Sequence, residues 1–157
     1  MNDEIRIGII YPGGGAEHEY YIHAEKSKQN IQIFLALSRH GGTENNDHDV
    51  EELKKTARID WICEAADRIL CLDLNVLFYA CTSGSFVLGR SHAEKQIQTL
   101  KEKSNLPAGS TSLAFVKALN LLKFERIGLL GTYPEDATLL FLNFLNEFNI
   151  KIQKLDY

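Results

Sequence analysis

The sequence has few residues that could cross-link the chain or anchor it. Three cysteines occur in 157 residues, and an odd number without the close spacing of small secreted domains argues against a disulfide framework. No apolar run approaches the roughly 20 residues of a membrane span. The acidic start, Met1-Asn2-Asp3-Glu4, lacks the basic and apolar regions of a signal peptide. We therefore expect a cytoplasmic protein with no membrane partner.

Positive charge is also scarce. The net charge is −4 and the pI is about 5.7, a balance that argues against nucleic acid or an anionic membrane as the main partner. The sequence has no low-complexity segment and no Pro- or Ser-rich linker. A chain of this length buries a core without disulfides or metals. These features predict one globular domain, or one domain and part of another.

Strand-like and helix-like segments alternate along the chain. Strands are expected at residues 5–11, 30–37, 76–80, 106–109, 126–130 and 150–155. Helices are expected at residues 17–29, 50–70, 86–103, 112–122 and 137–148, and a polar loop at 43–49. This alternation predicts βαβ units, and hence an α/β fold with a parallel sheet and helices on both of its faces.

One cysteine stands where a buried strand should end. Cys81 follows the apolar run 76–80 and precedes a Thr-Ser-Gly-Ser sequence, and ligands bind at the carboxyl ends of strands in open α/β sheets. Thr82 or Ser83 could cap the next helix, whose N–H groups would favour a carboxylate and lower the pKa of the thiol. The alternative is a structural cysteine followed by a plain cap, which is our interpretation of Cys63 and Cys71.

The first expected strand leads into a glycine-rich loop, Pro12-Gly13-Gly14-Gly15. Glycine N–H groups can cradle an anion, although a glycine run is equally consistent with a flexible turn. His18 stands where a dinucleotide fingerprint needs glycine, and no Gly-Lys-Ser/Thr follows. Dinucleotide and nucleoside triphosphate binding are therefore not expected.

Two further loops carry hydroxyl groups. Ser110-Thr111-Ser112 follows the fourth expected strand, and Gly131-Thr132-Tyr133-Pro134 follows the fifth. Each alone could be a helix cap or a turn, but four such loops at one edge of a sheet favour a ligand site.

Two other kinds of site are not supported. No Gly-x-Ser-x-Gly pattern surrounds the serines, so a serine nucleophile is not expected. Cys71, Cys81 and His92 lack the paired spacing of zinc ligands, so no metal is expected. The five histidines are interpreted mainly as solvated side chains.

With these segments in view, the chain resembles the aspartate/glutamate racemase superfamily, and within it the maleate cis-trans isomerase and arylmalonate decarboxylase branch. The segments that carry the resemblance are Gly8–Pro12, Arg39, Ala80–Phe86, Ser110–Ala114 with Ala118-Leu119, and Arg126–Tyr133. The decarboxylases have glycine where this chain has Cys81, which places it nearer the isomerases.

The resemblance implies a flavodoxin-like, racemase-type domain at residues 1–123 and the start of a second, similar domain at 124–157. Members of the superfamily continue well beyond this length, so we expect a truncated chain that lacks the second catalytic cysteine. The unfinished second sheet should expose strand edges that promote association into a homo-oligomer.

The resemblance also implies a cofactor-independent isomerase or racemase that acts on a small dicarboxylic acid such as maleate or aspartate. Cys81 would be the catalytic thiolate. The substrate-binding residues would be Pro12, Gly14, Gly15, Thr82, Ser83, Thr111 and Tyr133. The isomerases carry an asparagine near Gly15, which this chain lacks. Two alternatives are a non-catalytic carboxylate-binding domain and a flavodoxin-like domain that binds a phosphorylated ligand.

Overall fold

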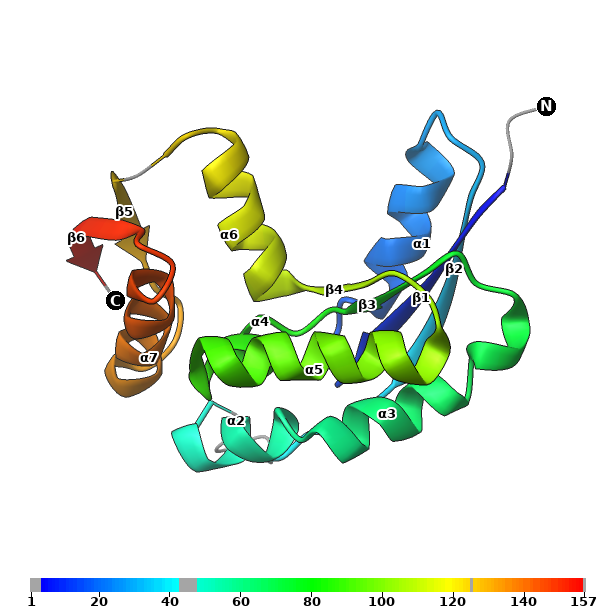
Figure 1. Cartoon of the computed structure of the whole chain (residues 1–157), viewed down its shortest axis with the longest axis horizontal. Helices are drawn as coiled ribbons and strands as arrows, with labels where there is room; N and C mark the ends of the chain where they lie inside the picture. The colour runs from blue at the N-terminus through cyan, green and yellow to red at the C-terminus, as the bar shows by residue number, and fades with distance from the viewer. Residues whose placement is uncertain (1–3, 43–47, 125, 157) are drawn as a thin grey trace.

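The computed structural model describes residues 4–42, 48–124 and 126–156. Four parallel strands, β1 (Ile5–Tyr11), β2 (Ile31–Leu37), β3 (Val76–Tyr79) and β4 (Ala108–Ser110), form a sheet in the order β2-β1-β3-β4. A second parallel pair, β5 (Arg126–Leu130) and β6 (Lys151–Asp156), forms a separate sheet. Figure 1 shows the two sheets at opposite ends of the molecule. The expected parallel α/β fold is confirmed.

Helices cover both faces of the four-stranded sheet. On one face, α3 (Ile59–Asp67) and α5 (Gly89–Ser104) pack against the sheet (Figure 1). Their buried apolar side chains form one core with residues of the strands, such as Ile62 and Leu100 with Ile10 and Leu77. On the other face lies α1 (Glu17–Lys26), none of whose residues is buried. Among the described residues, no helix is long and apolar enough to cross a membrane.

The strand order creates a break in the winding at β1. In the register of the sheet, Ile10 pairs with Ala36 of β2 on one side and with Tyr79 of β3 on the other. The chain leaves β1 for β2 in one direction, and later strands are added in the opposite direction. Ligands of open α/β sheets bind at such a switch point, outside the carboxyl ends of the strands. The loop after Tyr11 and the turn at Cys81 both lie there.

The prediction of one continuous helix over residues 50–70 is wrong. It is divided into α2 (Val50–Thr56) and α3, with an extended backbone at Arg58, and is followed by the 3₁₀ turn η1 (Leu70–Leu72). Side chains from elsewhere take the carbonyl groups at the break. Tyr79 Oη donates to the Thr56 carbonyl at 3.0 Å, and Gln96 Nε2 donates to that of Ala57 at 2.8 Å. These tertiary hydrogen bonds override the periodic pattern.

The predicted helix 86–103 also begins differently. A short helix, α4 (Thr82–Phe86), comes first, and α5 begins only at Gly89. Gly89 has a φ of +77°, a left-handed conformation that separates the two helices and suits glycine. Before this break in the helix, Phe86 of α4 is fully buried in a second hydrophobic core, which also contains later residues such as Val116 and Phe144.

The second core joins the two-stranded sheet to the rest of the chain. Helix α6 (Thr111–Leu121) contributes Val116, and α7 (Glu135–Asn146) contributes Phe141 and Phe144. Phe86 packs against Phe141 with ring centroids 4.8 Å apart. The separate sheets fit a division near residues 123 and 124, but α4 and α6 pack into the core of the second sheet. The boundary itself stays a prediction.

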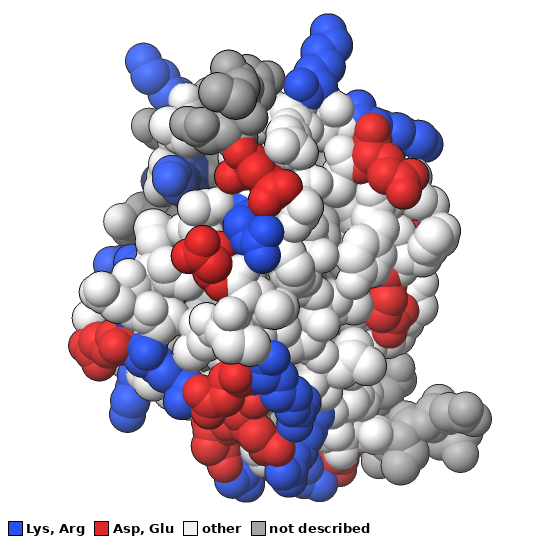
Figure 2. Space-filling model, turned by 90° about the vertical axis from the view of Figure 1, so that its right-hand side faces the viewer, with Lys and Arg blue, Asp and Glu red and all other residues white. Residues whose placement is uncertain are grey.

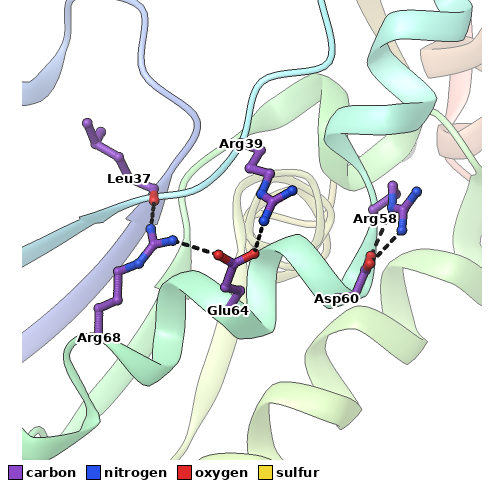
Figure 3. A network of polar contacts seen from close by, with 6 residues as sticks. All are labelled: Leu37, Arg39, Arg58, Asp60, Glu64 and Arg68. Carbon is purple, nitrogen blue, oxygen red and sulfur yellow. Dashed lines mark hydrogen bonds and ion pairs between the residues drawn. The ribbon is translucent and has the colours of Figure 1, made fainter.

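The end of β2 is tied to α3 by a chain of polar contacts (Figure 3). Arg68 donates to the Leu37 carbonyl at 2.7 Å and pairs with Glu64 at 3.0 Å. Glu64 also pairs with Arg39 at 2.8 Å. Figure 2 shows positive and negative side chains interspersed on one side of the molecule, with no stripe of a single sign there. The absence of a nucleic-acid partner stays a prediction.

Candidate functional site: the cavity at Cys81

Cys81 caps the helix that follows it. Its backbone is extended, with φ −138° and ψ 113°, and its Sγ accepts a hydrogen bond from the Gly84 N–H at 3.3 Å. The Ser83 hydroxyl lies 3.8 Å from the same sulfur. The prediction that Thr82 or Ser83 caps this helix is therefore wrong. The thiol replaces the usual hydroxyl or carboxylate oxygen as the cap.

A hydroxyl network fixes the Cys81 turn to the N-terminus of α6. Ser112 Oγ donates to the Thr82 carbonyl at 2.9 Å, and Ser85 Oγ donates to Ser112 Oγ at 2.7 Å. Ser85 Oγ in turn accepts from the Ser112 N–H at 3.1 Å. Ser85 and Ser112 are both buried. Ser112, one of the hydroxyl residues that the sequence suggested as a cap, thus joins Ser85 across 27 residues of the chain.

A cavity of about 800 Å³ opens beside Cys81 at the edge of the sheet. Its lining residues are Tyr11, Pro12, Gly13, Gly14, Tyr20, His40, Gly42, His48, Ala80, Cys81, Thr82, Ser83, Thr111 and Tyr133. Of the predicted site residues, Cys81, Pro12, Gly14, Thr82, Ser83, Thr111 and Tyr133 lie together in this lining. Gly15 does not belong to it. The four predicted loops therefore converge on one cavity.

The glycine loop approaches the cavity in a backbone conformation that suits only glycine. Gly14 has a φ of +122°, and a Cβ at this position would lie 3.3 Å from Tyr11 Oη. Gly15 also has a positive φ, but its position is exposed, with no atom within 4 Å of where a Cβ would be. Both glycines are exposed, but only Gly14 belongs to the lining of the cavity.

Seven lining residues were not predicted as site residues: Tyr11, Gly13, Tyr20, His40, Gly42, His48 and Ala80. The rings of Tyr11 and Tyr20 meet edge to face, with their centroids 5.7 Å apart. The His48 ring meets that of Tyr133 at 5.4 Å. His40 and His48 are exposed, in line with the interpretation of the histidines as mainly solvated side chains. His92 is half-buried instead, and its Nε2 lies 3.0 Å from the Ala57 carbonyl oxygen. Position after a strand could have indicated His40, but nothing in the sequence singled out Tyr20.

The cavity is lined by a thiol and phenols whose pKa values are raised, which favours their neutral forms. Burial raises the pKa of Cys81, while hydrogen bonds from Gly84, Ser83 and Tyr79 oppose the shift. The Gly84 N–H at the helix terminus lowers this pKa, as expected, but burial raises it more, so the net shift is upward. Burial also raises the pKa of Tyr11, Tyr20 and Tyr133. Among the described residues, no Asp, Glu, Lys or Arg lines the cavity.

The other two cysteines lie elsewhere. Cys63 is partly buried on α3, where burial raises its pKa. Cys71 is exposed in η1. Neither lines the cavity. The site thus has one thiol among the residues that the structure describes.

Comparisons with known proteins agree with the expected superfamily. A family model described as arylmalonate decarboxylase matches residues 48–157. A search of curated proteins found no match. Similar folds occur in solved structures of maleate isomerases and of arylmalonate decarboxylase, at identities that show the fold alone. The maleate isomerase Iso from Pseudomonas putida S16 is 14% identical with a TM-score of 0.78, over 98% of this chain and 63% of that one.

A variant of the Nocardia farcinica maleate cis-trans isomerase is 19% identical with a TM-score of 0.76, again over 98% and 63% of the two chains. Unliganded arylmalonate decarboxylase is 20% identical with a TM-score of 0.72, over 96% and 62%. The chain thus spans a little over three fifths of the length of these structures. Since the family model matches well over half of its residues, the chain belongs to the arylmalonate decarboxylase family.

Proposed function

We propose that this chain provides the Cys81 half of a cofactor-independent isomerase or racemase that acts on a small dicarboxylic acid such as maleate. The observation that carries the proposal is the shared cavity, in which the thiol of Cys81 faces the same space as Thr82, Ser83, Thr111 and Tyr133. These groups come from the ends of three strands. A nucleophile surrounded by hydroxyl and backbone donors is the arrangement that acid chemistry of this kind requires.

A carboxylate fits the donors of this cavity. Hydroxyl groups are contributed by Thr82, Ser83, Thr111 and Tyr133, and backbone N–H groups by the glycine loop around Gly14. No acidic side chain in the described lining would repel an anion. Such donors also stabilise the extra charge that a carboxylate gains when it becomes an enediolate, as an oxyanion hole does.

In the isomerase form of the reaction, Cys81 Sγ as thiolate adds to one alkene carbon of maleate and forms a C–S bond. The alkene electron pair moves to the neighbouring carbon and its carboxylate, giving an enediolate held by the donors. Rotation about the new single bond follows. The electron pair then restores the double bond in the trans form and the C–S bond breaks, which returns the thiolate. Atoms and charge balance, and no cofactor takes part.

One similar structure supports this chemistry. The Nocardia farcinica maleate cis-trans isomerase variant is described with a covalently bound succinylcysteine intermediate. A succinyl group on a cysteine is what the addition of a thiol to maleate produces. For this chain, which spans about three fifths of that protein, the activity and the substrate are proposals.

The second candidate is a carboxylate-binding domain without catalysis. Two observations favour it. Burial raises the pKa of Cys81, so little thiolate is present at neutral pH. The described part of the cavity also contains no second thiol. We also propose that the chain associates with itself through the two-stranded sheet, whose outer edges are unpaired among the described residues.

Proton NMR of maleate incubated with the full chain separates the candidates, because maleate and fumarate give distinct signals and saturation-transfer measurements report binding. Cys81→Ser removes the nucleophile, and Cys71→Ser is the matched control at an exposed thiol. Fumarate formation that Cys81→Ser abolishes and Cys71→Ser preserves supports the isomerase. Binding without turnover that survives Cys81→Ser supports the second candidate. No binding of maleate or aspartate would refute both.

A further inference from the structure

A buried phenol lies directly beneath the Cys81 turn. Tyr79 is the last residue of β3, and its side chain is fully buried. Its hydroxyl donates to the Thr56 carbonyl at 3.0 Å. Because a carbonyl oxygen only accepts, the phenolic proton points toward Thr56. The lone pairs of the phenol oxygen are then free to face Gly84 and Cys81.

The first turn of α4 is shaped to admit this hydroxyl. A Cβ on Gly84 would lie far inside van der Waals contact with Tyr79 Oη and 3.0 Å from Cys81 Sγ. The phenol oxygen and the sulfur therefore border the same small space under Gly84. The two side chains are close enough there for each to shift the pKa of the other. The glycine at position 84 is what allows both groups to reach this point.

The acceptor of the phenol is itself held in place. Thr56 ends α2 and is 1% exposed. Its Oγ1 accepts from the Gly41 N–H at 2.8 Å and donates to the Glu52 carbonyl at 3.1 Å. Gly41 lies between His40 and Gly42, which line the cavity. Thr56 is thus a fixed partner, and it connects Tyr79 to Gly41, the neighbour of two lining residues.

We propose that Tyr79 is a positioning residue for Cys81. Its hydroxyl accepts a hydrogen bond when Cys81 is a thiol and donates one when Cys81 is a thiolate. In the thiol form, the S–H group donates to Tyr79 Oη while the phenol donates to Thr56. When the thiol loses its proton, the hydroxyl turns from Thr56 to Sγ. The inference rests on the proposed function, because a group that stabilises the thiolate has a role only where that thiolate reacts.

The exchange predicts the direction of one measurable shift. The Tyr79 hydrogen bond lowers the pKa of Cys81 against the effect of burial, so its removal should raise that pKa further. Other titratable groups line the same cavity on the elements around it: Tyr11, Tyr20, Tyr133, His40 and His48. They are retained in the variants below, so their influence on the pH profile is common to all.

The test is the rate of Cys81 alkylation by iodoacetamide between pH 7 and 10, followed by peptide mass spectrometry. Tyr79→Phe removes only the hydroxyl, and Tyr21→Phe is the matched control at a partly exposed ring on α1, outside the cavity. We expect the Tyr79→Phe profile to move up by about one pH unit, which is about a tenfold slower reaction at a fixed pH below the pKa. An unshifted profile in a folded Tyr79→Phe would overturn the inference.

A measurement on the unsubstituted Tyr79 covers the case in which Tyr79→Phe does not fold. In a Cys63→Ala/Cys71→Ala chain, the Raman S–H band comes from Cys81 alone. A band shifted to lower frequency than that of the exposed Cys71 in a Cys63→Ala/Cys81→Ala chain supports the donated S–H hydrogen bond, and an unshifted band contradicts it. Failure of the proposed function is seen separately, since maleate would then neither bind nor turn over whatever the profile of Cys81.

Discussion

Gly84→Ala tests the packing on which the site depends. The new methyl group would collide with Tyr79 Oη and would lie 3.0 Å from Cys81 Sγ and 3.2 Å from Tyr79 Cζ. The phenol is fully buried at the end of a strand, so it has no free space to enter. Either α4 shifts outward or the phenol loses its hydrogen bond to Thr56.

The magnitude follows from three contributions. Overpacking of a tight core costs about 1–3 kcal/mol, and a buried carbonyl left without its donor costs about 1–3 kcal/mol more. Replacing glycine by alanine inside a helix returns about 1 kcal/mol. The unfavourable contributions are the larger, and we expect the free energy of unfolding to fall by about 1–5 kcal/mol. This is a large part of the roughly 5–15 kcal/mol that stabilises a typical domain.

Urea unfolding followed by the fluorescence of the single tryptophan, Trp61, measures this change. The matched control is Gly128→Ala on β5, where a Cβ would meet only the Lys154 carbonyl at 3.9 Å. In a Tyr79→Phe background the nearest obstacle is gone, so Gly84→Ala should cost at least about 1 kcal/mol less than in the unsubstituted chain. A Gly84→Ala chain as stable as the Gly128→Ala control would refute the packing argument.

Three further outcomes are expected. Ser112→Ala should lower the free energy of unfolding by about 1 kcal/mol in the same assay, because it removes the hydrogen bonds of the Ser112 hydroxyl while Ser85 Oγ keeps its own bond to the Thr82 carbonyl at 3.0 Å. Below its raised pKa, Cys81 should be alkylated about tenfold faster for each unit of pH, and a flat rate between pH 7 and 8.5 would show that thiolate already predominates. The free energy of unfolding should fall above about pH 9, because the folded chain holds the protons of Cys81 and Tyr79 more tightly than the unfolded chain does; constant stability from pH 8 to 10.5 in chemical unfolding would contradict the raised values.

Local patterns predicted most of the fold. The alternation of strands and helices was sufficient for the parallel sheet, because β-branched runs such as Ile5–Tyr11 have few other stable conformations in a buried core. The errors occur where distant side chains decide the local backbone. The break after Thr56 depends on donors from Tyr79 and Gln96, which lie 23 and 39 residues away from the carbonyls that they bind. No pattern within residues 50–70 could show it.

Local position along the chain likewise predicted some of the site residues and missed others. Cys81, Thr111 and Tyr133 were predicted because each follows a strand, and the carboxyl ends of parallel strands meet at one edge. Tyr20 was missed because it comes from a helix that folds back over this edge. The net pKa shift of Cys81 was missed, because the sequence indicates the helix N–H group that lowers this pKa but not the burial that outweighs it.

The central claim is that the cavity beside Cys81 binds a small dicarboxylate. Its most direct test is the rate of Cys81 alkylation at pH 8.5 with and without saturating maleate, with Cys71 of the same chain as the exposed internal reference. The account predicts that maleate slows the reaction of Cys81 several-fold and leaves that of Cys71 unchanged. Equal rates at Cys81 with and without maleate, or equal slowing of both cysteines, would contradict it.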